Sequence, residues 1–66
     1  MQVTVAEAVA QAKREFLPIE GVVGVGSVDN TIVFYVETEA DRAKVPTMYM
    51  GFPVVTRVVG RVRLLG

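Results

Sequence analysis

Two runs of strand-forming residues flank a two-residue turn in the stretch Gly21-Val22-Val23-Gly24-Val25-Gly26-Ser27-Val28-Asp29-Asn30-Thr31-Ile32-Val33-Phe34-Tyr35-Val36-Glu37. Asp29 and Asn30 both tolerate the positive φ that a tight hairpin turn requires. Such a turn pairs Val28 with Thr31, and further along it pairs Gly26 with Val33 and Gly24 with Tyr35. We predict that the core face of this hairpin carries Val23, Val25, Ile32, Phe34 and Val36.

An amphipathic helix precedes the hairpin. Thr4 and Glu7 have the spacing of a capping box, in which each side chain satisfies a free amide at the start of a helix. The apolar residues from Val5 to Phe16 recur at helical spacing and form one stripe. The residue before a proline avoids helical geometry, so Leu17-Pro18 ends the element. The sequence predicts a helix over Val5–Phe16.

A second, shorter helix and a last strand follow the hairpin. Thr38 and Asp41 repeat the capping spacing, which predicts a helix over residues 39–45 that ends at Pro46. Residues 47–53 are predicted to form a loop rich in Met and aromatic side chains that folds over the edge of the core. Alternation from residue 54 to residue 65 predicts the last strand, with a bend at Gly60. Its core face carries Val54, Val58 and Val62, and its other face carries Val55, Arg57, Val59, Arg61 and Arg63.

These elements define a single α+β domain over residues 1–66, a two-layer αββαβ sandwich. The connection from the second strand through the short helix to the last strand should be a right-handed, parallel crossover. We expect the last strand to lie beside the first, which gives a three-stranded, mainly antiparallel sheet with the first strand in the centre (order 2-1-3). Both helices would cover one face of this sheet, and the other face would stay uncovered.

The composition excludes several classes of chemistry. The 66 residues include no Cys, no His and no Trp. Disulfides, thiolate nucleophiles, Cys/His zinc sites and imidazole acid–base catalysis are therefore ruled out. The seven carboxylates are scattered between Glu7 and Asp41. We predict a protein that is not an enzyme, with no catalytic residue, no cofactor and no metal site.

Charge is distributed unevenly along the chain. Residues 1–41 contain all seven acids and two basic residues, a net charge of −5, and residues 42–66 contain five basic residues and no acid, a net charge of +5. Valines, Tyr35 and the last three arginines share the face that we expect to be uncovered. The predicted interaction surface consists of Val22, Val28, Val33, Tyr35, Val55, Arg57, Val59, Arg61 and Arg63.

Two functions fit this surface. An uncovered apolar sheet face or an open strand edge favours self-association, most simply as a dimer, or binding of a partner protein that the sequence does not name. Arginines beside an aromatic ring also match the way in which single-stranded nucleic acids are held. Overall neutrality and one aromatic ring make us favour the homo-oligomer over the nucleic-acid-binding domain.

Neither export nor membrane insertion is expected. Residues 1–7 lack a basic head followed by an apolar run. The longest uncharged stretch, Val45 to Thr56, is too short to cross a bilayer. The sequence predicts a cytoplasmic protein.

One resemblance rests on the runs Val22-Val23-Gly24-Val25-Gly26, Thr31-Ile32-Val33-Phe34-Tyr35-Val36-Glu37 and Val45-Pro46, and on the spacing of Gly51-Phe52-Pro53-Val54. The chain resembles the small α+β segment that precedes the protease domain in some bacterial trypsin-like serine peptidases, a segment that also occurs in short prokaryotic proteins. The catalytic Ser, His and Asp of that family lie in the protease domain. The resemblance therefore implies an α+β fold and no peptidase activity for these 66 residues.

Overall fold

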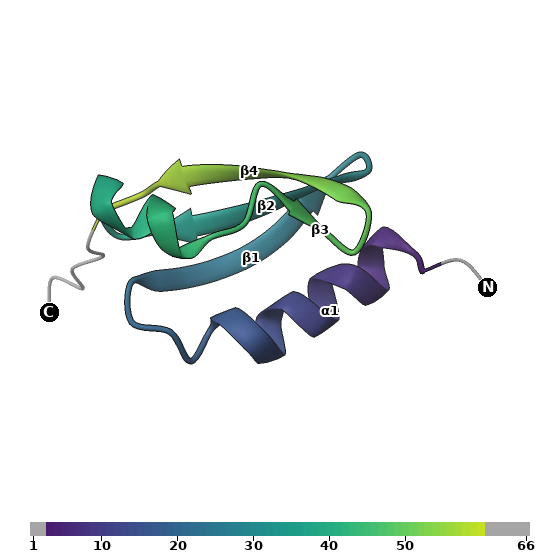
Figure 1. Ribbon diagram of the computed structural model, residues 1–66, viewed down its shortest axis with the longest axis horizontal. Coiled ribbons are helices and arrows are strands. Elements are labelled where there is room, and N and C mark those ends of the chain that lie inside the picture. Colours follow the sequence, from purple (N-terminus) through teal and green to yellow (C-terminus); the bar gives the residue numbers. More distant parts are fainter. Residues whose placement is uncertain (1–2, 61–66) are drawn as a thin grey trace, which may run out of the picture.

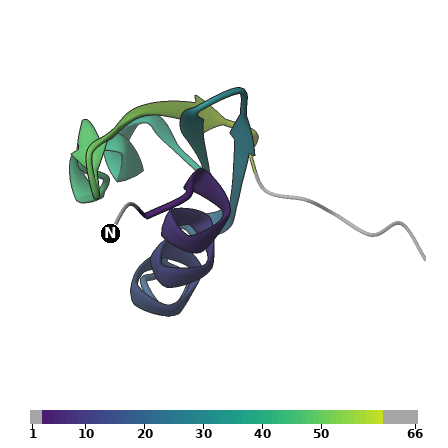
Figure 2. The same cartoon turned by 90° about the vertical axis from the view of Figure 1, so that its right-hand side faces the viewer.

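The structure, a computed structural model, describes residues 3–60 of the chain. Helix α1 (Val5–Phe16) has the predicted bounds, and the backbone N–H of Glu7 donates to Oγ1 of Thr4 at 3.1 Å, as the capping box requires. The strands are β1 (Val22–Val28), β2 (Thr31–Val36), β3 (Met48–Tyr49) and β4 (Phe52–Val58). A 3-10 helix, η1 (Glu39–Lys44), connects β2 to β3. Figure 2 shows α1 on the inner side of a curved sheet.

The strand order corrects the predicted topology. The sheet is four-stranded and mixed, in the order β1-β2-β4-β3, so β2 and not β1 is central. β1 pairs with β2 in antiparallel fashion, and β4 lies parallel to the other edge of β2 (Figure 1). The crossover through η1 brings β4 to the edge of β2 opposite β1, so β2 is paired on both sides. Ile32, Phe34 and Val36 are all fully buried.

The segment between the short helix and the last strand also differs from the expectation. The predicted helix over residues 39–45 is the six-residue 3-10 helix η1, so only one α-helix covers the sheet. The predicted loop contains β3, which forms a hairpin with β4. Met50 (φ 49°) and Gly51 (φ 87°) form its two-residue turn, in which both residues have positive φ. β4 consequently begins at Phe52, two residues earlier than predicted.

The register of the first hairpin is the predicted one, except at its start. Val28 pairs with Thr31, Gly26 with Val33 and Gly24 with Tyr35, as the turn at Asp29-Asn30 indicates. Val22 then pairs with Val36, so one extra residue, Val23, forms a β-bulge. The bulge reverses the predicted roles of two valines: Val22 is 6% exposed in the core, and Val23 is 45% exposed.

The core lies between α1 and the inner sheet face. Its aromatic centre is Phe34, whose ring meets the ring of Phe16 edge-on at 5.0 Å between centroids. Phe16 also meets Tyr49 of β3, at 5.7 Å, so the β3–β4 hairpin closes over the open end of the core as its Met- and aromatic-rich sequence predicts. Val54 and Val58 pack against this cluster. Val62, also predicted for the core, lies outside the described residues.

Replacing Phe34 by alanine should destabilise the fold by about 3–5 kcal/mol, because the fully buried ring leaves a cavity that its neighbours fill only in part. Met48→Ala, at a side chain that is 58% exposed, is the control and should change stability by less than about 1 kcal/mol. Denaturant unfolding followed by circular dichroism measures both. Equal effects of the two substitutions would contradict this description of the core.

Tyr49 provides a second test of how β3 docks on α1. Its hydroxyl donates a hydrogen bond to Oε2 of Glu15, and burial, reinforced by this carboxylate, raises the pKa of Tyr49 to about 12 from its ordinary value of 10. The folded state thus holds this proton more tightly than the unfolded chain does. Tyr49 contributes stability that is fully present below pH 10 and is lost as the pH rises toward about 12.

Phenolate absorbance in a Tyr35→Phe variant isolates Tyr49, because the chain has two tyrosines. The midpoint should lie near 12, and adding Glu15→Gln should lower it. Far-ultraviolet circular dichroism of the same samples reports whether the fold persists. An ordinary midpoint near 10 in folded protein would show that β3 does not dock in this way.

Candidate interaction surface

The sheet face opposite α1 is not covered by any described element. The strand register places on this outer face Gly24, Gly26, Val28, Thr31, Val33, Tyr35, Val55 and Arg57. Val33 is only 4% exposed, because its neighbours on three strands surround it, whereas Val28 is 62% and Val55 45% exposed. The outer face is therefore an apolar surface with its most accessible side chains on β1 and β4.

Tyr35 covers the glycines of β1, in line with the predicted pairing of Gly24 with Tyr35. A Cβ atom added at Gly24 would lie 3.5 Å from Cδ2 of Tyr35, and one added at Gly26 would lie 3.8 Å from Cε2 of the same ring. The ring thus fills the space that two missing side chains leave, an arrangement known as aromatic rescue. Both glycines are inside a strand and far from a helix N-terminus, so they do not form a phosphate-binding loop.

The structure brings together part of the predicted surface. Val28, Val33, Tyr35, Val55 and Arg57 share the outer face. Val59 follows β4, is 45% exposed, and donates its N–H to the carbonyl of Val36 at 2.9 Å. Val22 does not belong to this surface, because the bulge turns its side chain into the core. Arg61 and Arg63 lie outside the described residues.

Tyr35 and Arg57 are direct neighbours in the parallel register of β2 and β4. Arg57 is exposed, and it is the only basic residue that the register of residues 3–60 places on the outer face. Among the residues proposed to bind nucleic acid, the structure therefore describes one aromatic ring and one guanidinium group.

One edge of the sheet is β1, which the predicted strand order placed in the centre. The other edge is formed by the two-residue β3 and by the part of β4 that β3 does not pair with. The seven residues of β1 include no charge and no proline, which are the usual protections of an edge strand. Successive residues of β2 direct their backbone groups to opposite sides of the strand. The N–H of Glu37 donates to the carbonyl of Gly21 on the β1 side, and the carbonyl of Val36 accepts from the N–H of Val59 on the β4 side. By the same alternation, the backbone groups of Val25 and Ser27 point away from β2, toward the free edge.

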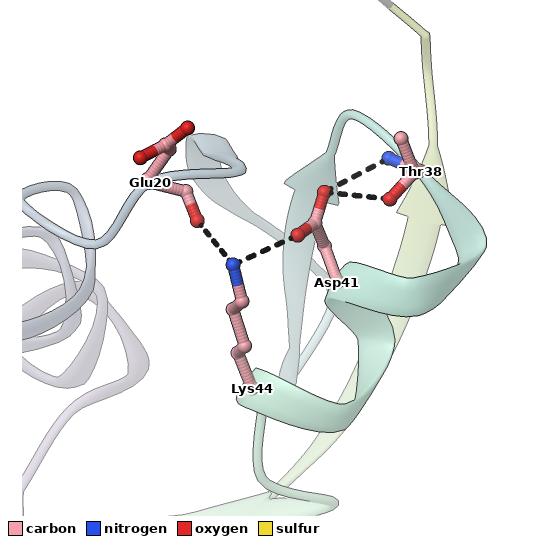
Figure 3. A network of polar contacts seen from close by, with 4 residues as sticks. All are labelled: Glu20, Thr38, Asp41 and Lys44. Atoms are coloured by element: carbon pink, nitrogen blue, oxygen red, sulfur yellow. Dashed lines mark hydrogen bonds and ion pairs between the residues drawn. The ribbon is translucent and has the colours of Figure 1, made fainter.

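A polar cluster ties η1 to the loop that precedes β1 (Figure 3). The carboxylate of Asp41 accepts hydrogen bonds from the N–H and hydroxyl of Thr38, at 3.1 and 2.9 Å, and its Oδ1 atom lies 3.0 Å from Nζ of Lys44. Nζ also donates to the carbonyl of Glu20 at 2.8 Å. Asp41 is 8% exposed, the only buried charged residue in the described range. The capping role predicted for Asp41 is confirmed.

Gly21 completes this cluster because a side chain does not fit there. A Cβ atom at Gly21 would lie 2.3 Å from Oδ1 of Asp41, and the residue has a φ of +100°. The hydrogen bond from Lys44, followed by those from Thr38, lowers the pKa of Asp41 below its ordinary 3.8, against the opposing effect of burial. Every buried polar side-chain atom in the described range has a partner. The cluster therefore holds η1 against the loop that precedes β1.

The described residues 3–60 contain no pocket and no group of three or more acidic residues that could hold a metal ion. No helix in this range is long and apolar enough to cross a membrane. Comparisons with family models, with curated proteins and with solved structures gave no match for the chain. The resemblance to the segment that precedes a trypsin-like protease domain stays a prediction.

Asp41→Asn should reduce stability at neutral pH, because it removes the charge that pairs with Lys44. Because the pKa of Asp41 is lower in the folded protein than its ordinary 3.8, the carboxylate contributes stability above pH 3.8. This contribution is lost as the pH falls through the pKa of the folded state. The stability difference between the wild type and the variant should therefore shrink below pH 3.8. Glu39→Gln is the matched control, because its ion pair with Arg42 is exposed and worth little. Denaturant unfolding across this pH range checks both, and a constant difference would contradict the assignment.

Proposed function

We propose that this protein is a non-enzymatic interaction module that assembles with a second copy of itself. The observation that supports this proposal is the β1 edge, which has free backbone groups, no charge and no proline, and which borders the apolar outer face. Val28, Val55 and Val59 are each between 45% and 62% exposed on it. Exposed apolar side chains beside an open strand edge favour a protein–protein contact.

The size of the chain adds a thermodynamic reason. A domain of about 60 residues buries only roughly 60% of the surface of its unfolded chain and is marginally stable alone. Small domains gain stability from disulfides, metals or oligomerisation. The absence of Cys and His from the sequence removes disulfides and soft-metal sites. A tightly packed core and assembly with a second copy are the two routes that this composition leaves.

Single-stranded nucleic acid is the second candidate partner. The observation in its favour is the adjacency of Tyr35 and Arg57 in the register of β2 and β4. A base could stack on the ring while the guanidinium group contacts a phosphate. The acids of the N-terminal part of the chain oppose the approach of a polyanion, so self-association is the first proposal.

Sedimentation equilibrium of the wild type over a range of micromolar concentrations tests the proposal. We expect the mass to rise from that of the 7.2 kDa chain toward that of a dimer as the concentration increases. A gel-shift titration with single-stranded oligonucleotides at low and high salt tests the second candidate, because phosphate contacts weaken steeply with salt. A 7.2 kDa species at every concentration would overturn self-association. Salt-sensitive binding by that monomer would favour the nucleic-acid function.

A further inference from the structure

We propose that two copies join edge to edge through β1, antiparallel about a two-fold axis next to Gly26. The two four-stranded sheets then become one continuous sheet, with both α1 helices on the same side. This inference rests on the proposed self-association and states which surface performs it. A sheet edge with free backbone groups and no charged residue is the standard site of such pairing.

The register follows from the two features that limit β1. The bulge at Val23 interrupts the strand at one end, and the turn at Asp29 ends it at the other. The regular part therefore runs from Gly24 to Val28, and its middle residue is Gly26. A strand that pairs with its own copy uses its full regular length only when the two-fold axis passes its middle residue. Pairing centred on Val25 or Ser27 would extend into the bulge or the turn.

Backbone and side chains both fit this register. The outward groups of Val25 pair with those of Ser27 in the second copy, and the symmetry repeats the pair. On the outer face, Val28 of each copy lies opposite Gly24 of the other. Val28 is the most exposed large apolar residue among those described, and Gly24 offers the space beside the ring of Tyr35. No charged residue of β1 meets its own copy.

Helix α1 provides an independent argument for a second copy as the partner. The helix packs chiefly beneath β1, and the Tyr49 hydroxyl holds Glu15 on the flank that faces β3. At 100° per residue, Ala6, Lys13 and Leu17 project from the opposite flank, away from β3. All three are exposed, Leu17 by 41%. The side of α1 nearest the β1 edge therefore carries a small residue, an apolar residue and one base, Lys13.

The charges at the two ends of α1 are complementary across the same axis. The two-fold axis would place the two helices side by side and antiparallel. Glu7 is in the first turn of α1, and Lys13 and Arg14 are in the last turn. Each N-terminal acid would then lie near the C-terminal bases of the other copy, and the two helix dipoles would oppose each other favourably.

Engineered cysteines test the register, because the natural chain contains none. Gly26→Cys should form an intermolecular disulfide under mild oxidation, because residues 26 of the two copies face each other with Cβ atoms about 4.5–5.5 Å apart. Gly24→Cys is the matched control. The cysteines at position 24 of the two copies would lie four residues apart along the paired strands, about 13 Å, which is too far for a disulfide. Neither Cβ meets an atom closer than 3.5 Å in the monomer.

Non-reducing electrophoresis should show at least tenfold more covalent dimer for Gly26→Cys than for Gly24→Cys. Circular dichroism of the reduced proteins controls for folding. Equal cross-linking, or preferential cross-linking of Gly24→Cys, would overturn the register. The wild-type mass decides separately whether self-association occurs at all.

A second pair of variants distinguishes the edge from the outer face and does not depend on cysteine. Val28→Lys places a charge on the β1 edge, and Val55→Lys places one on β4, at similarly exposed positions that should tolerate it. We expect Val28→Lys to raise the dimer dissociation constant more than tenfold and Val55→Lys to change it less than threefold. The reverse order, or equal losses, would overturn the edge assignment and indicate a face-to-face dimer.

Discussion

Strand β2 is paired along both of its edges, and this double pairing organises the molecule. Its backbone groups alternate between β1 and β4, so the position of every other strand is set relative to it. Ile32, Phe34 and Val36 are fully buried on the inner face, where Phe34 meets Phe16 of α1. The crossover through η1 must return β4 to the free edge of β2, and Asp41, Lys44 and Gly21 hold that connection against the loop before β1.

Local signals were sufficient for the parts of the fold that depend on neighbours in sequence. The capping box of Thr4 and Glu7 marks the start of α1, and Asp29-Asn30 determines the hairpin register. The strand order depends instead on whether the crossover brings the last strand to the free edge of β1 or of β2, and the sequence pattern does not distinguish these two edges. The sequence around Val23 does not predict a bulge, because residues 22–24 are valine or glycine, and either face of the sheet can accept them. That single residue explains why Val22 and Val23 exchanged their expected roles.

The prediction of the interaction surface was correct where it depended on the hairpin register and wrong where it depended on the strand order. The covering of Gly24 and Gly26 by Tyr35 follows from a correct register, and so do the positions of Val28 and Val33. The open edge was assigned to the wrong strands because the strand order was wrong. The hydrogen bond from Lys44 to the carbonyl of Glu20 joins residues 24 positions apart, so only the three-dimensional structure reveals it.

The bulge also bears on how the length of this chain can vary. In a regular strand, inserting or deleting one residue turns every following side chain to the opposite face. Here the ladder from Gly24 to Val28 is anchored by the turn, and Val22 already reaches the core across one surplus residue. Loss of Val23 would leave a regular strand with both anchors in place. Homologous sequences that differ in length by one residue before Gly24 could therefore share this fold.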